Sequence, residues 1–385
     1  MATGCQILTE KCFPVYLGAM NQLAKDLNKT LEGTAALELL SSLGKRFYFP
    51  KGIVAQSSEA SEHAHRFNAT IGMARYKGKP VNLPSIRALV PELDTDEIFP
   101  YAPTPGVKQL RDLWKTHMTR KNPDLAGKAT SLPLVISGIT TGISILADLF
   151  IDPEDVVVIP DMFWGNYRLI IEGKREGKIV NFPFFDGRGK LDMNAMAAAL
   201  DAQKSRGKVV ILLNFPNNPT GYAPTADEIA PMAKVLKEAA EGGLKILAIV
   251  DDSYYGLFYE TDVYTQSVFA AIAGLHENIL AVKLDGATKE DFAWGFRVGF
   301  LTYGGKGLTD AHYTALVAKT MGVIRSTISN SSKLGQSLIL RALTSDSYEA
   351  EKKENFAVLK GKYDALKEAL AAYGDHPVLE SLPFN

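Results

Sequence analysis

The stretch KILAIVDD, residues 245–252, decides the fold class, because it is apolar through its centre and ends in two carboxylates. A strand that is apolar along its whole length is typical of a parallel sheet covered by helices on both faces. From about residue 130 onward such runs alternate with helical stretches; the other runs are LPLVIS, DVVVIP, GKIVNFPF, KVVILLNF, NILAVKLD and VGFLTY. The pattern predicts an α/β protein with a mostly parallel central sheet flanked by helices.

The two ends of the chain differ from this centre, since they are helix-rich, more charged and without such runs. Near the C-terminus, SYEAEKKENFAVLKGKYDALKEALAAYG has apolar residues at helical spacing and ends at Gly374, which predicts a long amphipathic helix. We predict an N-terminal arm with part of a small domain at 1–67, a large domain at 68–340 and the rest of the small domain at 341–385.

Composition excludes several classes of protein. The chain has 385 residues, 46% of them hydrophobic, and a net charge of -1, which gives no electrostatic reason to expect nucleic acid or an anionic membrane as a partner. It shows no secretion signal and no apolar run near the roughly 18 residues of a membrane helix. Small-molecule or protein partners remain.

Cysteine and histidine usage bears on redox setting and metals. Cys5 and Cys12 are the two cysteines, which argues against a disulfide framework or a cysteine zinc site and favours a reducing, cytoplasmic setting. His63 and His65, in SEHAHR, could be read as metal ligands. Without further ligands that pair is more typical of a solvated loop, so we expect no metal.

Residues just after strands deserve the most weight, because ligands of such sheets collect at the carboxyl ends of the strands. In SGITTG, the amides of Ile139 and Thr140 open a helix, where an anion such as a phosphate is favoured. An ordinary strand-to-helix turn is the alternative. Trp164, in MFWGNY, either stacks on a flat heteroaromatic ligand or packs in the protein.

Two further strands end in polar residues. Asn218, in the turn PNNPTGY, offers an amide that both donates and accepts hydrogen bonds. Asp251 ends a buried strand, and Tyr254 follows three residues later. Burying a carboxylate costs so much desolvation that it requires a cationic or protonated partner, and a protonated ring nitrogen would serve.

The segment KLDGATKEDFAWGFRVGF, residues 283–300, places Lys289 at another strand end and Arg297 eight residues later. A lysine beside ED is ordinarily solvated, but at a strand end a lysine can become a nucleophile toward aldehydes, and an arginine matches phosphate. Taken together, the strand-end residues describe one ligand with a phosphate, a protonated ring and an aldehyde. That ligand is pyridoxal 5'-phosphate (PLP), whose protein sites pair a Schiff-base lysine with an acidic partner of the ring nitrogen.

From about residue 68 onward the sequence resembles the class I aminotransferases of the aspartate aminotransferase fold (PLP fold type I). The quoted motifs are NNPTG, DDSY and TKEDFAWGFRVG. The resemblance implies that Lys289 is the Schiff-base lysine and that Asp251 contacts the ring nitrogen. It also implies that Asn218 and Tyr254 contact the ring hydroxyl and that Arg297 binds the phosphate.

Weaker matches concern the partner subunit and the substrate. YAPTPGVKQLR is similar to the family segment whose tyrosine, here Tyr101, reaches the phosphate of a neighbouring subunit, which implies a homodimer with shared active sites. TIGMARYKGK resembles a substrate loop and places Gly72 near the substrate. IRSTISNSS resembles the segment whose arginine, here Arg325, reaches a substrate side-chain carboxylate across the dimer, although Ser331 and Ser332 replace the usual prolines.

The sequence departs from the family at two points. Gly286 stands where a phosphate-binding hydroxyl is usual, three residues before the lysine, so Thr140 or Thr288 must compensate or the phosphate is held less tightly. The sequence stops at VLESLPFN before the family's arginine for the substrate α-carboxylate. We therefore expect either a truncated sequence or unusual substrate binding.

The resemblance implies a ping-pong transamination between an amino acid, of aspartate/glutamate or aromatic type, and a 2-oxo acid. Lys289 would transfer the proton, while Asp251 and Tyr254 would support the ring and Asn218 would also contact substrate. Other PLP chemistries on the same scaffold, a β-lyase, a synthase or a decarboxylase, remain alternatives. A PLP-binding regulatory module is a further alternative, but the first 65 residues show no basic helix-turn-helix pattern.

Overall fold

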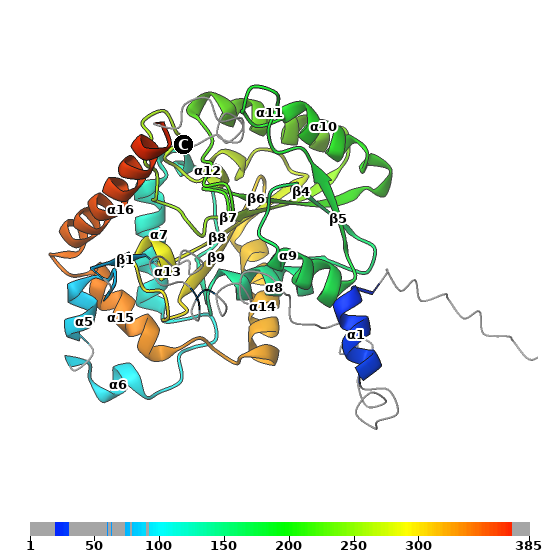
Figure 1. Ribbon diagram of the computed structural model, residues 1–385. Coiled ribbons are helices and arrows are strands. Elements are labelled where there is room, and N and C mark those ends of the chain that lie inside the picture. Colours follow the sequence, from blue (N-terminus) through cyan, green and yellow to red (C-terminus); the bar gives the residue numbers. More distant parts are fainter. Residues whose placement is uncertain are drawn as a thin grey trace, which may run out of the picture.

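The computed structural model describes residues 20–30, 60, 63, 74–77, 79–89 and 92–371. In this part of the chain the central element is a seven-stranded sheet in the order β3-β9-β8-β7-β6-β4-β5 (Figure 1). Strand β9 pairs antiparallel with both of its neighbours, and the remaining pairs are parallel. The strands are β3 (Leu134–Ile136), β4 (Val156–Pro160), β5 (Lys178–Phe182), β6 (Lys208–Asn214), β7 (Lys245–Asp251), β8 (Ile279–Gly286) and β9 (Gly299–Gly305).

Helices surround this sheet, and a two-stranded ribbon precedes it. The ribbon consists of β1 (Arg75–Tyr76) and β2 (Lys79–Pro80). The helices before β6 are α1 (Gln22–Thr30), α5 (Pro84–Leu89), α6 (Thr95–Ile98), α7 (Lys108–Lys121), α8 (Ile139–Phe150), α9 (Asn166–Arg168) and α10 (Met193–Asp201). The later ones are α11 (Ala226–Glu241), α12 (Val268–Ile272), α13 (Ala287–Glu290), α14 (Asp310–Thr327), α15 (Lys333–Leu343) and α16 (Tyr348–Ala371). Short 3₁₀ or π turns are Pro123–Leu125, Leu169–Lys174 and Lys204–Arg206.

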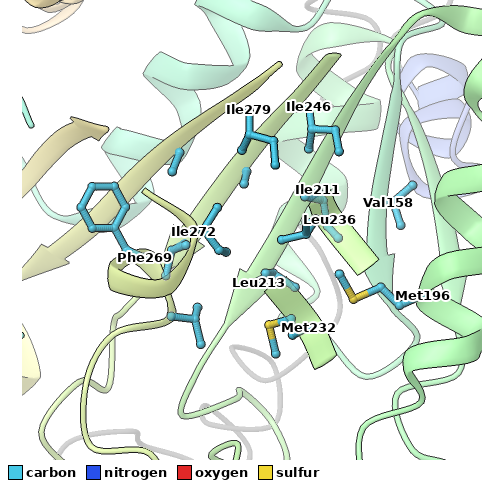
Figure 2. Packing of buried hydrophobic residues seen from close by; sticks show 14 of the residues in the cluster. Val158, Met196, Ile211, Leu213, Met232, Leu236, Ile246, Phe269, Ile272 and Ile279 are labelled. Atoms are coloured by element: carbon cyan, nitrogen blue, oxygen red, sulfur yellow. The ribbon is translucent and has the colours of Figure 1, made fainter. Parts of the chain in front are cut away.

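The strand side chains alternate between two cores, one on each face of the sheet. In β4, Val156 and Val158 enter the core under α10, α11 and α12, whereas Val157 and Ile159 enter the core under α8 and α14. Figure 2 shows the first core, where Met196 and Met232 from the helices meet Ile211 and Leu213 of β6. Because both faces are buried, the strands are apolar throughout, as the sequence pattern predicted.

A third core joins residues around 81–86 to α15 and α16. It contains Leu83, Trp114, Phe300 and Tyr348, and it also contains Ala287 and Phe292, which flank Lys289 at a distance of two and three residues. Helix α16 lies along the side of the molecule next to α7 in Figure 1, and hydrogen bonds from Arg120 and Lys121 of α7 reach Glu349 and the Lys289 turn. The turn that carries Lys289 is thereby enclosed by α7, α15 and α16.

The predicted fold class is confirmed, because all of the apolar runs quoted above form strands of one mostly parallel sheet. The predicted C-terminal helix is present as α16, while its expected end at Gly374 lies outside the described residues. Most of 1–67 also lies outside them, so the division at 67 and 340 stays a prediction. Searching the described helices reveals none with the length and apolarity that a membrane span requires.

Candidate active site

A pocket of about 160 Å³ lies at the carboxyl ends of the central strands. Each strand-end motif found in the sequence contributes a side chain or a backbone turn to it, although the motifs are spread over residues 139–297. The lining residues are Ile139, Thr140, Trp164, Tyr167, Asn214, Asn218, Asp251, Ser253, Tyr254, Thr288, Lys289 and Arg297. The topology thus gathers the predicted cofactor residues in one place, with the exception of Tyr101.

Asp251, the last residue of β7, brings a carboxylate into the pocket while being only 2% exposed. Its Oδ2 accepts a hydrogen bond of 2.6 Å from the Tyr167 hydroxyl, and its Oδ1 accepts from the amide and hydroxyl of Ser253 at 3.0 and 2.5 Å. Within the described residues no lysine or arginine forms an ion pair with it. A carboxylate has about four acceptor positions, so these three bonds leave room for one more donor from the pocket.

In the hydrogen bond between Tyr167 and Asp251 the proton stays on the Tyr167 hydroxyl, which is the donor. Burial, reinforced by the neighbouring Asp251 charge, raises the pKa of Tyr167 well above its ordinary value. Burial and the same carboxylate also raise the pKa of Tyr254. Both phenols are therefore neutral at physiological pH.

Lys289 lines the same pocket from the short helix α13, with its Nζ 4.6 Å from the centre of the Tyr254 ring. Burial lowers the pKa of Lys289, and the positive charge of Arg297 lowers it further, against the opposing influence of Asp251. A lower pKa makes the neutral amine more abundant at physiological pH, which is what a nucleophile or a proton acceptor requires.

The start of α8 and Arg297 form the cationic end of the pocket. Gly138 caps α8 at φ +83°, and the first residues of the helix, Ile139 and Thr140, line the pocket. A Cβ on Gly138 would lie 2.3 Å from Nη2 of Arg297, so the guanidinium occupies the space that glycine leaves open. Free amides at a helix start together with a guanidinium are the features of a phosphate site.

Gly286, the departure noted in the sequence, has a steric explanation. A Cβ there would lie 2.7 Å from Cα of Gly299, its partner on β9, and 2.8 Å from the carbonyl oxygen of Val298, the residue just before β9. Gly299 in turn packs against Gly138, since a Cβ added to Gly299 would lie 3.2 Å from Cα of Gly138. A serine or threonine at residue 286 is thus excluded by backbone, whereas the side chains of Thr140 and Thr288 do line the pocket.

The remaining predicted cofactor residues lie between these ends. Asn218 lines the pocket, and its backbone amide donates to Oδ1 of Asn214 at 2.7 Å, which fixes the Asn-Pro turn. Trp164 meets the Tyr167 ring edge-on at 5.5 Å between ring centres. Among the described residues, the side chains of Asn218, Tyr254 and Lys289 form no hydrogen bond, so their polar atoms remain available to a ligand.

Three predicted residues are not brought into this pocket. Tyr101 is 91% exposed at the surface, and Arg325 is exposed on α14, where it donates to the Ser329 hydroxyl at 2.5 Å. Both were expected to act across a dimer, which a single chain does not test. Gly72 lies outside the described residues, as does His65. In the described part, no group of three or more His, Cys, Asp or Glu side chains is placed to hold a metal.

Sequence reasoning missed three lining residues: Tyr167, Asn214 and Ser253. Asn214 is the last residue of β6 and donates to the Asp251 carbonyl oxygen at 2.8 Å, so it links two strand ends. A signal was present for Asn214 and Ser253, because Asn214 is the polar last residue of a predicted strand and Ser253 follows Asp251 by two residues. Tyr167 stands in a helix after β4, and its role depends on a contact with a residue 84 positions away.

A buried ionic triad supports the site from beneath. Lys283 is 0% exposed and pairs with Asp252 at 2.6 Å and Asp285 at 2.7 Å. Burial raises the pKa of Asp252 to about 6, even though Lys283 opposes the shift. The triad joins the residue after Asp251 to the strand that leads to Lys289, so it fixes the two chemically important strand ends relative to each other.

A lysine, a buried carboxylate and a cationic helix start, gathered at the strand ends of one sheet, are the combination that a PLP site uses. The family model described as "Aminotransferase class I and II" matches residues 64–382. The chain therefore belongs to the class I and II aminotransferases, whose members use PLP. This confirms the predicted family and its cofactor.

Individual relatives are more distant. The chain is 22% identical over 250 residues to a "Probable N-acetyl-LL-diaminopimelate aminotransferase" of Bacillus subtilis (strain 168), covering 65% of this chain and 58% of the relative. It is 30% identical over 152 residues to an aspartate aminotransferase of Musicola paradisiaca (strain Ech703), covering 39% and 34% of the two chains. The match thus spans about a third to somewhat over half of these relatives.

A solved structure shows the same fold. The crystal structure of an aminotransferase from Anaerococcus prevotii DSM 20548 superimposes with a TM-score of 0.76 at 22% identity, covering 87% of this chain and 82% of that one. At this identity the likeness concerns the fold alone.

The pocket fits PLP by its own chemistry. The Asp251 carboxylate suits a protonated ring nitrogen, the Lys289 amine suits an aldehyde, and Arg297 with the start of α8 suits a phosphate. These groups lie in one pocket. The side chains of Asn218 and Tyr254, which also line it, have polar atoms without a hydrogen bond among the described residues. A different ligand would have to use the same three charges in the same pocket.

Proposed function

We propose that the protein is a PLP-dependent aminotransferase that moves an amino group between an amino acid and a 2-oxo acid by a ping-pong mechanism. The observation that carries this proposal is that one pocket unites Asp251 at the end of β7 with Lys289 and Arg297 from the segment between β8 and β9. The bound cofactor would supply the electron sink that makes the substrate α-carbon acidic. The protein's own residues would hold the cofactor and move the proton.

Lys289 is the proposed proton carrier. In the first half of the reaction its Nζ would accept the proton from the substrate α-carbon and deliver it to C4' of the cofactor. In the second half it would carry a proton in the reverse direction, so the amine ends each half as it began. Its lowered pKa supports this role, because proton transfer is most efficient when the pKa lies near the working pH. The adjacent Tyr254 ring limits where the amine can move.

The other lining residues would bind and orient. Asp251 would hold the ring nitrogen protonated, with Tyr167 and Ser253 fixing its carboxylate. Asn218 and Tyr254 would contact the ring hydroxyl, and Trp164 would stack on the ring. The phosphate would be bound by Arg297 and by the backbone at Ile139 and Thr140, the first residues of α8. The hydroxyl of Thr140 or Thr288 would replace the one that Gly286 lacks.

The substrate class is a finer part of the proposal. We propose a dicarboxylic or aromatic amino acid, with Arg325 binding a substrate side-chain carboxylate and Gly72 near the substrate. The exposed Arg325 and Tyr101 support a homodimer with shared sites, since neither side chain has a role in the pocket of its own chain. We place the activity in the cytoplasm on the strength of the low cysteine content.

A panel of amino donors with 2-oxoglutarate as acceptor tests the function. We expect amino transfer that depends on the 2-oxo acid, and we expect Arg325→Ala to lower the aspartate and glutamate rates more than the aromatic ones. Release of the amino group as ammonia without a 2-oxo acid would instead identify a lyase. Unchanged aspartate and glutamate rates in Arg325→Ala would reject the role of Arg325.

A further inference from the structure

The two residues that follow Lys289 are carboxylates, and both are buried. Glu290 is 6% exposed and Asp291 is 1% exposed, although an ED pair after a lysine is ordinarily solvated. Aspartate and glutamate are almost never fully buried unless they are paired. Neither residue lines the candidate active site, so the proposed function gives them no role.

Their partners come from two distant helices. Glu290 forms ion pairs with Lys121, the last residue of α7, and with Lys352 of α16, the second at 3.4 Å. Asp291 accepts from the Tyr348 hydroxyl at 2.6 Å and from Lys352 at 3.1 Å. We call these five residues the carboxylate clamp: Lys121, Glu290, Asp291, Tyr348 and Lys352.

The charges of the clamp balance, with two carboxylates against two ammonium groups. Burial alone would raise the pKa of Glu290, but Lys121 and Lys352 outweigh it and lower the pKa to about 2. Burial would likewise lower the pKa of Lys352, yet Asp291 and Glu290 raise it above its ordinary value. Glu290 and Lys352 are therefore both ionised at physiological pH, and removing one of them leaves a buried charge without its partner.

The clamp acts on an element that cannot hold itself in place. Helix α13 spans only Ala287–Glu290, a single turn, and a lone turn is unstable without tertiary contacts. Lys289 points to one side of this turn, over the Tyr254 ring, while Glu290 and Asp291 point to the clamp. Ala287 and Phe292 fix the same turn in the third core, next to Tyr348.

We propose that Glu290 and Asp291 are positioning residues for Lys289: through the carboxylate clamp, α7 and α16 fix the direction in which the Lys289 amine enters the pocket. This inference rests on the proposed function only in giving Lys289 its chemical task. Glu290 and Asp291 touch neither substrate nor cofactor in it. Their effect on the reaction is transmitted through the backbone of α13.

The test compares Lys352→Met with Lys367→Met. Both lysines stand on α16 and pair with a glutamate, but Lys367 pairs with Glu260, away from the Lys289 turn. In cofactor-free protein, the rate at which an amine-reactive reagent labels Lys289 is measured against pH by mass spectrometry. A loosened turn exposes the amine to water, so we expect the pKa of Lys289 to rise toward the ordinary 10.5 in Lys352→Met and to stay unchanged in Lys367→Met.

Kinetics of the holoenzyme give the second readout. We expect kcat to fall by about 10- to 100-fold in Lys352→Met with little change in KM, the size of effect that a small misplacement of a reacting group produces. Lys352→Arg keeps the charge and should restore most of kcat. Tyr348→Phe, which removes one hydroxyl, should shift the labelling profile in the same direction and decides the question if Lys352→Met does not fold.

The outcomes are distinguishable. A wild-type labelling profile and kcat in folded Lys352→Met or Tyr348→Phe, with only a lower Tm, would show that the clamp stabilises the fold without positioning Lys289. Because labelling needs neither cofactor nor substrate, it decides this inference even if the wild-type protein transfers no amino group. In that case the proposed function fails on its own.

Discussion

The guanidinium of Arg297 lies so close to Gly138 that a Cβ at residue 138 would stand 2.3 Å from Nη2 and 2.8 Å from Cζ. Gly138 also has φ +83° and ψ 162°, a backbone conformation that is essentially restricted to glycine and costs other L-residues about 1–3 kcal/mol. A side chain at residue 138 therefore has to displace the arginine and strain the turn that opens α8. Both effects fall on the proposed phosphate site.

Gly138→Ala should consequently weaken PLP binding by about 10-fold or more, the equivalent of roughly 1.4 kcal/mol. The measurement is a titration of cofactor-free protein with PLP, followed by absorbance. Gly165→Ala is the matched control, because Gly165 stands near the pocket at φ -55° and a Cβ there meets nothing within 4 Å. Equal affinity of Gly138→Ala and wild type would remove Arg297 from the phosphate site.

Asp251 and Tyr167 should differ in the size of their effects. Asp251→Asn removes the charge that is proposed to keep the ring nitrogen protonated, and we expect kcat/KM to fall by at least about 100-fold. Tyr167→Phe removes one 2.6 Å hydrogen bond to the carboxylate, and bonds to charged groups contribute about 1.5–3 kcal/mol, so a smaller loss is expected. An Asp251→Asn enzyme as active as wild type would contradict the assignment.

Lys289 is expected to cost the protein stability. Its folded pKa lies below that of the unfolded chain, so the folded state binds fewer protons between the two pKa values. The cost is fully present below the folded pKa and disappears as pH rises through the unfolded value of 10.5. Cofactor-free Lys289→Met should therefore have a higher Tm than wild type at pH 7, with the difference shrinking toward pH 10.5. A lower Tm across the whole range would show that the amine is not strained by burial.

Replacing Lys283 should lower the folding stability, whereas replacing Lys289 should raise it, because Lys283 forms buried ion pairs with Asp252 and Asp285. Lys283→Met leaves Asp252 and Asp285 buried without their cation, which costs about 3–5 kcal/mol of folding free energy. Lys360→Met, which breaks an exposed pair with Asp364, should cost less than about 1 kcal/mol. The midpoints of urea unfolding compare the two variants. Similar midpoints would mean that the triad contributes no more than a surface pair.

Those parts of the structure that depend on local pattern were predictable from the sequence. A parallel strand buried on both faces has to be apolar throughout, so KILAIVDD and the other apolar runs predicted the sheet. Because ligands bind at the carboxyl ends of such strands, the same pattern then indicated Asp251 and Lys289. The functional weight of Lys289 also came from a resemblance, since lysine beside ED is by itself a typical surface sequence.

The parts that depend on distant contacts were not predictable. Glu290 meets Lys121 across 169 positions and Asp291 meets Tyr348 across 57, and nothing local distinguishes these residues from solvated ones. The same holds for Tyr167, whose importance arises from Asp251. Gly286 shows the converse limit: the sequence marked it as a departure from the family, but only the approach of β9 explains why a side chain is excluded.

Attachment of the cofactor to Lys289 is the central claim, and borohydride reduction tests it most directly. Wild-type protein is loaded with PLP, reduced and digested, and the modified peptide is identified by mass spectrometry. We predict that PLP is fixed on the peptide carrying Lys289, and that Lys289→Ala loses this modification, the visible absorbance of the bound cofactor and the amino transfer together. PLP fixed on a different lysine, with Lys289→Ala still transferring amino groups at the wild-type rate, would contradict the account.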